Sequence, residues 1–318
     1  MIEQRILRTV TLAAFCLCLA VGPALAGDTN ANAGTSAFSF LKINIGARPV
    51  AMGGAFTGVA DDESSLYYNP AGITSFEQSR YILGYHNYFE DLQSGFIGYI
   101  KPLDDQKALA FYASYLNYGD FPETDMLGNV TGTFGGGDML IAATFAIRQT
   151  HQFSVGITGK FIHEKIQDYS SSGVAFDLGV RYTSDRGRLV GGLMLQNFGT
   201  QLSTFAAEEK DDLPTVLRGG VSVRPRHLPF VFAGDFIMPF DNDLDFALGA
   251  EYRELEYLLL RMGWNSFGSN YKAADSDGGL AGFAMGVGIK LKSMEASYAF
   301  APGADLGDSH RITLTGGI

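Results

Sequence analysis

Large apolar residues alternate with small or polar residues along most of the chain after residue 77. In residues 151–165 the members of one face are apolar: Phe153, Val155, Ile157 and Phe161. The opposite face is small or polar: Ser154, Gly156, Thr158 and Lys160. A period of two residues is typical of a β-strand with one apolar face. The clearest patterns persist beyond the ~5–6 residues of an ordinary strand and match the ~9–11 residues that cross a bilayer at a tilt.

Turn residues divide this region into about fourteen expected strands. They cover residues 78–88, 91–101, 106–117, 135–148, 151–165, 172–184, 188–198, 214–224, 229–238, 243–253, 256–265, 279–291, 293–300 and 309–318. Tight turns such as "TSDRG" and "RPRH" alternate with expected long loops at residues 117–135, 199–213 and 266–279. An even strand number, with short turns at one end and long loops at the other, is typical of bacterial barrels. The predicted fold class is all-β, a transmembrane antiparallel β-barrel of about 14 strands.

The first 26 residues have a different character. Arg5 and Arg8 precede an apolar run, which ends near Pro23 and the small-residue sequence Ala24-Leu25-Ala26. This order predicts a secretory signal peptide, and the shortness of the run argues against the alternative of a membrane anchor. Both cysteines lie in this segment, so no disulfide is expected afterwards. The expected organisation is a signal peptide at 1–26, an N-terminal segment at 27–77 and a barrel at 78–318.

Composition narrows the class of protein. The formal net charge is −11, which does not suit binding to nucleic-acid phosphates. Aromatic residues make up 13% of the chain and 40 residues are glycine, yet no apolar run after residue 26 is long enough for a spanning helix. These features favour the bacterial outer membrane. Acidic residues concentrate in the expected long loops. They either keep the loops soluble or meet lipopolysaccharide phosphates through bridging divalent cations.

The stretch Ala51–Ile73, "AMGGAFTGVADDESSLYYNPAGI", does not alternate. Gly53 and Gly54 permit close backbone approach. Asp61 and Asp62, with the glutamate that follows them, predict the cap and first turn of a short helix. Asn69-Pro70 then breaks that helix. A fourteen-stranded barrel is wider than side chains alone can fill, so we expect this segment inside the lumen.

Residues 46–73, "GARPVAMGGAFTGVADDESSLYYNPAGI", resemble the N-terminal signature of the FadL-like outer-membrane proteins, and most closely their PorV/PorQ branch. Residues 296–314, "ASYAFAPGADLGDSHRITL", are similar to the closing hairpin of that branch. The resemblance implies a barrel closed by an N-terminal hatch. Its expected hatch residues are Gly53, Gly54, Asp61, Asp62, Asn69, Pro70 and Ala71. One departure is that the chain ends at Ile318, where such barrels usually end on an aromatic residue.

The resemblance implies two alternative functions. Family members import long-chain fatty acids or aromatic hydrocarbons, which implies passive passage of small hydrophobic molecules through a hatch-gated lumen. PorV-like members act with a protein secretion system, which implies a non-transporting docking or shuttle component whose long loops contact secretion-system proteins. A continuous apolar cavity past the hatch would favour the first alternative, and a sealed lumen would favour the second.

No catalytic or metal-binding constellation is visible. The five histidines are scattered over different expected strands and turns, without the spacing of metal ligands, and no cofactor or enzymatic activity is expected. Nine charged residues are expected to face the lumen: Asp177, Arg181, Arg253, Lys290, Glu295 and the four candidate ligand contacts, Arg218, Asp235, Glu251 and Arg261. Either they hold the hatch by cross-strand pairing, or Arg218 or Arg261 meets the carboxylate of a passing ligand.

Overall fold

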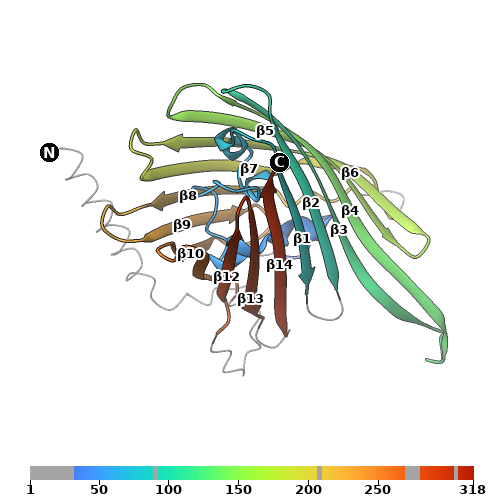
Figure 1. Cartoon of the computed structure of the whole chain (residues 1–318). Helices are drawn as coiled ribbons and strands as arrows, with labels where there is room; N and C mark the ends of the chain where they lie inside the picture. The colour runs from blue at the N-terminus through green and yellow to red at the C-terminus, as the bar shows by residue number, and fades with distance from the viewer. Residues whose placement is uncertain (1–31, 89–91, 206–209, 269–279, 304–306) are drawn as a thin grey trace. The chain divides into compact units, whose positions relative to one another are not determined.

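Fourteen antiparallel strands form a closed barrel in the described part of the computed structural model (Figure 1). The structure describes residues 32–88, 92–205, 210–268, 280–303 and 307–318, so the expected signal peptide lies outside the described residues. The strands are β1 (Arg80–Asn87), β2 (Gln93–Pro102), β3 (Lys107–Thr124), β4 (Val130–Arg148), β5 (Phe153–Ile166), β6 (Tyr169–Thr183), β7 (Leu189–Ser203), β8 (Val216–Val223), β9 (Phe230–Pro239), β10 (Asp245–Tyr252), β11 (Leu258–Asn265), β12 (Phe283–Leu291), β13 (Met294–Pro302) and β14 (Asp308–Gly317). Strands adjacent in sequence pair with each other, and β1 also pairs with β14. The predicted fold class is confirmed.

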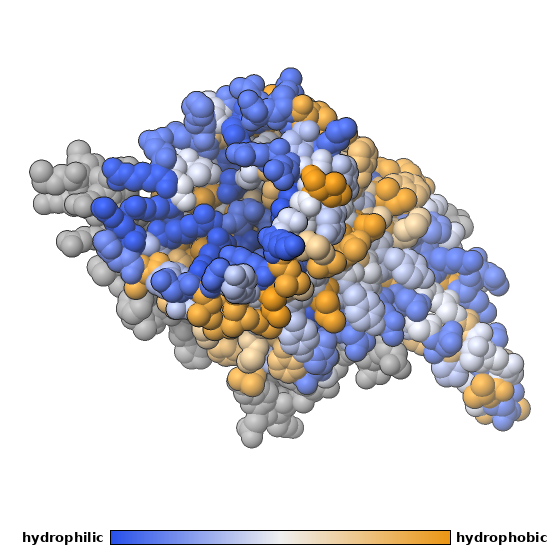
Figure 2. Space-filling view, viewed as in Figure 1, coloured by the Kyte–Doolittle hydropathy of each residue, from blue (hydrophilic) through white to orange (hydrophobic). Residues whose placement is uncertain are grey.

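The outward side chains of the strands are apolar, as the alternation predicts. In β5, Phe153, Ile157 and Phe161 are 45%, 44% and 43% exposed, whereas Ser154 and Thr158 are buried on the inner face. Figure 2 shows the result as a band of apolar surface between two more hydrophilic regions. An outer face of this kind suits the hydrocarbon core of a bilayer.

The two ends of the barrel differ. Connections at residues 103–106, 149–152, 184–188, 224–229, 253–257 and 292–293 lie at one end, which we call the short-turn end. The connections at the other end, which we call the loop end, include residues 204–215 and 266–282. The predicted separation of short turns from longer loops is present only in part. Connections 204–215 and 266–282 are long, but those at 88–92, 125–129, 167–168, 240–244 and 303–307 have two to five residues, as few as the turns at the other end.

Residues 117–135 do not form the expected long loop. Strands β3 and β4 continue through them to Thr124 and from Val130, and they form a hairpin that extends past its neighbours in Figure 1. Phe121 packs on Phe134 across this hairpin, with ring centroids 5.5 Å apart. The glycines, proline and acids of the stretch indicated a loop, but cross-strand contacts extend the strands. The expected loop 199–213 is also shorter, because β7 runs to Ser203.

The described part of the segment before β1, from residue 32, contains four short helices: η1 (Ser39–Lys42), α2 (Ala47–Ala51), α3 (Ser65–Tyr68) and η2 (Pro70–Ser75). No helix among the described residues is long and apolar enough to cross a membrane. We call residues 36–76 the luminal segment. The backbone nitrogen of Ala47 donates to Thr313 of β14, and that of Phe56 donates to Asp235 of β9. The Asn69 side chain donates to Val180 of β6. Because these strands are spread around a closed sheet, the segment lies inside the barrel.

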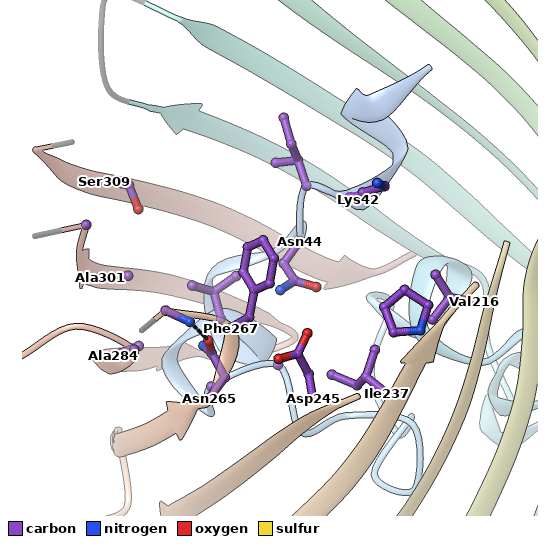
Figure 3. Close-up of a pocket in the computed structure, with 18 of the residues that line it drawn as sticks. Lys42, Asn44, Val216, Ile237, Asp245, Asn265, Phe267, Ala284, Ala301 and Ser309 are labelled. Atoms are coloured by element: carbon purple, nitrogen blue, oxygen red, sulfur yellow. Dashed lines mark hydrogen bonds between the residues drawn. The ribbon is translucent and has the colours of Figure 1, made fainter. Parts of the chain in front are cut away.

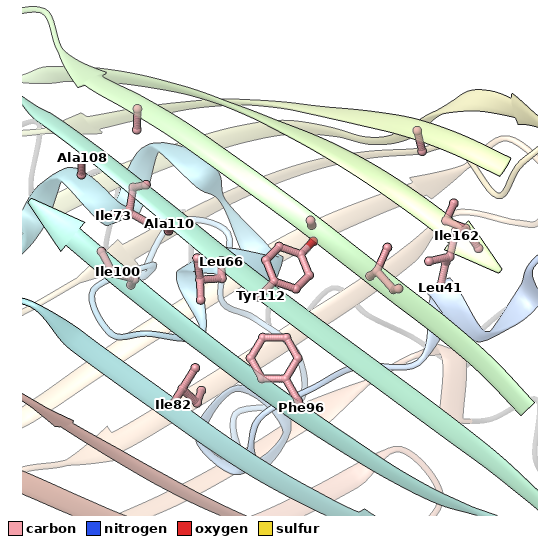
Figure 4. Close-up of a cluster of buried hydrophobic side chains, with 14 of the residues drawn as sticks. Leu41, Leu66, Ile73, Ile82, Phe96, Ile100, Ala108, Ala110, Tyr112 and Ile162 are labelled. Carbon is pink, nitrogen blue, oxygen red and sulfur yellow. The ribbon is translucent and has the colours of Figure 1, made fainter.

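Apolar packing fills the space between the luminal segment and β1–β6. Leu66 and Ile73 of the segment are fully buried and belong to one cluster with Ile82, Ile100 and Tyr112 of the wall (Figure 4). Burial of large aliphatic side chains contributes about 1.5–3 kcal/mol each to folding. This side of the lumen is therefore largely a hydrophobic core, with a small pocket of about 30 Å³ between the segment and β2–β4.

Candidate functional site

Gly53 allows the luminal segment to approach the wall closely. It adopts a φ of +68°, and a Cβ on it would lie 2.6 Å from the backbone of Trp264 in β11. Gly263 faces it, and a Cβ there would lie 2.1 Å from the backbone nitrogen of Gly53. Close-packed interiors do not tolerate such separations, so backbone packs directly on backbone here. Gly54 also has a positive φ, of +85°, but its nearest neighbour is the more distant side chain of Asn44.

Asn69, Pro70 and Ala71 connect two turns of the luminal segment to β6. The Asn69 Oδ1 atom accepts a hydrogen bond of 3.1 Å from the Ala71 backbone nitrogen. Its Nδ2 atom donates to the carbonyl oxygens of Thr57 and Val180, at 3.1 Å each. Pro70 begins η2, where a missing N–H costs no helical hydrogen bond. All of the hydrogen-bonding groups of the Asn69 side chain are thus used within a fully buried turn.

Arg48 joins the luminal segment to the wall by ion pairs. Its Nη1 atom lies 2.7 Å from Asp61 Oδ1 and 2.9 Å from Asp62 Oδ2. Its Nε atom lies 2.8 Å from Glu251 Oε2 on β10. Glu251 also pairs with Arg261 of β11 at 2.6 Å. Removing one member would leave a buried charge without its partner, which makes the network costly to open.

Arginines at the short-turn end also reach inward to the luminal segment. They come from five strands or strand ends: Arg80, Arg148, Arg181, Arg224 and Arg253. Arg224 and Arg253 both pair with Asp61. Burial alone would raise the pKa of Asp61, but Arg48 and these two arginines outweigh it and lower that pKa to about 2. The segment is therefore anchored at this end by a carboxylate that stays ionised.

Glu63 is held in a different electrostatic state. It is buried, its Oε1 atom lies 2.5 Å from Arg80 Nε, and its Oε2 atom has no hydrogen-bond partner among the described residues. Burial, together with the neighbouring Asp62, raises the pKa of Glu63 to about 7 even though Arg80 opposes the shift. This carboxyl group therefore titrates near neutral pH.

The acidic residues do not form the first turn of a helix, contrary to the prediction. Helix α3 begins at Ser65, and its first turn contains no acidic residue. Its N-cap residue, Ser64, makes no side-chain capping hydrogen bond. Asp62 Oδ1 instead accepts a 2.8 Å hydrogen bond from the Ser64 backbone nitrogen. The carboxylates of Asp61 and Asp62 form ion pairs with arginines distant in sequence. These charge-assisted hydrogen bonds are stronger than the local capping bonds that the sequence predicted.

A pocket of about 350 Å³ lies on the loop-end side of the luminal segment (Figure 3). The segment contributes Ile43 and Asn44, and the wall contributes Ile237 of β9 and Phe267 after β11. Its exposed lining is mostly apolar by area, and five charged residues also line it: Lys42, Arg218, Asp241, Asp245 and Arg311. Such a composition is typical of small-molecule sites, in which apolar walls bury the ligand and polar groups orient it.

Arg218 is the one of the four candidate ligand contacts that lines this pocket. It is buried, its Nη2 atom donates to the Gly54 carbonyl at 3.3 Å, and its guanidinium lies 5.2 Å from the ring centroid of Tyr68. Asp235 Oδ2 instead accepts hydrogen bonds from the backbone nitrogens of Phe56 and Thr57, at 3.0 and 2.9 Å.

Glu251 and Arg261 are buried in the Arg48 network. The three candidate ligand contacts other than Arg218 thus bind the luminal segment or each other. Sequence reasoning missed Arg48 and the ion pair of Lys42 with Asp241, which joins η1 to the β9–β10 connection. The only signal for Arg48 was a charge among small apolar residues. No group of His, Cys, Asp and Glu side chains in the described ranges could hold a metal ion.

Solved structures match this chain in fold, although no family model and no curated protein matches its sequence. The CymD monoaromatic hydrocarbon channel gives a TM-score of 0.58 at 14% identity, over 86% of this chain and 98% of that one. The toluene transporter TodX of Pseudomonas putida gives 0.58 at 13% identity, over 86% and 96%. The barrel shares their fold.

Proposed function

We propose that the protein is a bacterial outer-membrane channel through which small hydrophobic molecules, such as long-chain fatty acids, pass down their gradient. The observation that carries this proposal is the mostly apolar pocket between the luminal segment and the loop end. The fold shared with two hydrocarbon channels and the apolar outer surface support it. The barrel would lie among outer-membrane lipid and lipopolysaccharide, and it would catalyse no reaction.

In this proposal the luminal segment is the hatch. A ligand enters the pocket from the loop end, and a shift within residues 46–73 opens the way onward. Asn69 and Pro70 hold the hatch, because Asn69 bonds both to Thr57 and to the wall and Pro70 packs on Gly179. A small loosening at this turn therefore enlarges the passage without removing the segment from the barrel.

The double substitution Asn69→Ala with Pro70→Ala tests the hatch. We expect higher single-channel conductance in planar bilayers and faster uptake of a fluorescent fatty acid into proteoliposomes. Gln106→Ala, at an exposed position of a short turn, is the control. Conductance and uptake equal to wild type would reject the gating role, and an absence of uptake for every hydrophobic probe would reject the channel.

A docking component of a secretion system is the second candidate. Two observations favour it. Residues 47–60 of the luminal segment are all buried, as expected of a lumen that the segment closes. The β3–β4 hairpin ends on the exposed apolar side chains of Met126 and Leu127, which a partner protein could cover. A photo-crosslinking residue at position 127 in intact cells would then capture a protein of a secretion apparatus. The same residue at the exposed Leu103 of the short-turn end would not capture it. Equal capture at both positions, or none, contradicts docking through the hairpin.

A further inference from the structure

Two opposite charges stand in one row on the wall of the pocket. Arg218 of β8 pairs in register with Ile237 of β9, and Ile237 pairs with Asp245 of β10. All three residues line the pocket. Neighbouring strands lie about 4.8 Å apart, so the backbones of Arg218 and Asp245 are about 10 Å apart with Ile237 between them. A cation and an anion thus face the same cavity across one apolar side chain.

The protein itself leaves both charges without an ion-pair partner. Among the described residues, Arg218 has no carboxylate within 4.0 Å, and its buried Nε atom has no hydrogen-bond partner. Asp235 attracts Arg218 from beyond ion-pair distance; its Oδ2 atom binds the backbone of the luminal segment, and its Oδ1 atom has no hydrogen-bond partner among the described residues. Asp245 Oδ1 accepts a 2.9 Å hydrogen bond from the Ser266 hydroxyl. No cationic side chain in the described ranges lies within ion-pair distance of the Asp245 carboxylate. Buried charges without partners are costly, and a ligand that supplies both partners removes this cost.

Lys42, Asp241 and Arg311 also line the pocket, but the part beside the Arg218–Asp245 row suits an apolar body. Figure 3 shows Asp245 reaching into the cavity toward Asn44, with Ile237 and Val216 on one side and Phe267 on another. A head group between Arg218 and Asp245 therefore continues into space lined by aliphatic and aromatic side chains. The amide of Asn44 offers a further hydrogen bond to the head group.

We propose that the pocket recognises amphiphiles whose head carries both a carboxylate and an ammonium group, as in an α-amino acid with a long apolar side chain. This inference rests on the proposed function, since it names the class of molecule that would enter the channel. Arg218 binds the carboxylate and Asp245 binds the ammonium group by charge-assisted hydrogen bonds. A plain carboxylate is attracted by Arg218 but repelled by Asp245. A plain hydrocarbon leaves both charges unpaired.

Three probes with the same chain length test the inference: decanoate, decylamine and 2-aminodecanoate. Binding to the full chain in lipid nanodiscs is measured by calorimetry. We expect 2-aminodecanoate to bind about tenfold or more tightly than decanoate, because one charge-assisted hydrogen bond contributes about 1.5 kcal/mol or more. Asp245→Asn should weaken 2-aminodecanoate by about tenfold and tighten decanoate, since it removes the attraction in one case and the repulsion in the other. Arg218→Gln should weaken both acids and tighten decylamine.

Asp105→Asn is the matched control, because Asp105 is exposed at the short-turn end and does not line the pocket. It should leave the three affinities unchanged. Equal binding of decanoate and 2-aminodecanoate by the wild type overturns the inference, and this measurement needs no folded variant. Proteoliposome uptake separates the two proposals. Uptake of decanoate without any preference for the amino group contradicts only this inference, whereas no uptake of any probe contradicts the channel itself.

Discussion

Arg48 donates two hydrogen bonds to Glu251, from Nε to Oε2 at 2.8 Å and from Nη2 to Oε1 at 3.1 Å. The two residues are separated by most of the barrel in sequence, and both side chains are buried. A bidentate pair of this kind fixes orientation as well as distance, because the planar guanidinium matches the carboxylate. The luminal segment is therefore held in one rotational setting inside the barrel.

Arg48→Ala should destabilise this arrangement strongly. It leaves Asp62 without an ion-pair partner among the described residues, while Asp61 and Glu251 keep other arginines. Breaking a buried ion pair costs about 3–5 kcal/mol. We expect a lower urea midpoint in lipid vesicles and a higher conductance. Arg226→Ala, at an exposed short turn, is the control and should leave both quantities unchanged. Wild-type stability in Arg48→Ala would show that the network does not hold the segment.

Stability should fall as the pH rises toward neutral because of Glu63. Its folded-state pKa of about 7 lies above the ordinary value of 4.5, so its contribution is fully present below pH 4.5 and is lost as the pH passes 7. At about 1.4 kcal/mol per pKa unit the change is on the order of 3 kcal/mol. Glu63→Gln should remove this dependence, measured as urea midpoints from pH 4.5 to 8. The exposed Glu77→Gln should retain it. An identical pH profile for Glu63→Gln and wild type would refute the assignment.

Two adjacent glycines of β7, Gly191 and Gly192, should differ in their tolerance of alanine. A Cβ on Gly192 would lie 2.1 Å from the Thr57 carbonyl oxygen, whereas a Cβ on Gly191 would meet nothing within 4 Å. Gly192→Ala therefore displaces the luminal segment or prevents folding, while Gly191→Ala folds normally. Heat-modifiable mobility on gels reports the folded barrel, and conductance reports the position of the segment. Equal behaviour of the two variants would mean that Thr57 does not pack on this wall.

The ion pair of Lys42 with Asp241 should slow entry to the pocket. It fixes η1 to the β9–β10 connection beside the cavity, and both residues line that cavity. The pair is partly exposed, so its contribution is at most about 1 kcal/mol, and Lys42→Ala should speed ligand uptake by about fivefold or less. The exchange Lys42→Asp with Asp241→Lys should restore the wild-type rate. Slow uptake in Lys42→Ala would contradict this role.

Local patterns predicted the barrel because each strand carries its own signal. Alternation placed Phe153 outside and Ser154 inside without reference to any other strand. The prediction of close backbone approach at Gly53 and Gly54 is confirmed only for Gly53, because the atoms nearest to a Cβ on Gly54 belong to side chains. Sequence reasoning expected Arg218 to face the lumen, and the structure shows it on the wall of the pocket.

Features that depend on distant partners were not predictable in this way. Residues 117–135 contain turn-forming residues, and only the pairing of Phe121 with Phe134 across the hairpin shows that they are strand. Asp61 resembles a helix cap locally, yet its partners are Arg48, Arg224 and Arg253. Asp245 gained significance only from the register that places it in one row with Arg218.

The luminal segment touches both strands of the seam that closes the barrel: Glu63 pairs with Arg80 of β1, and Ala47 bonds to Thr313 of β14. If the barrel closed first, the luminal segment would have to enter through one of its ends, and chains rarely thread through a closed structure in this way. This geometry predicts an order of assembly. The N-terminal residues are made first, so we expect them to pack on the open sheet before its first and last strands join and enclose them. A factor that binds the unpaired edges of β1 and β14 during assembly would therefore bind a sheet on which the luminal segment is already packed.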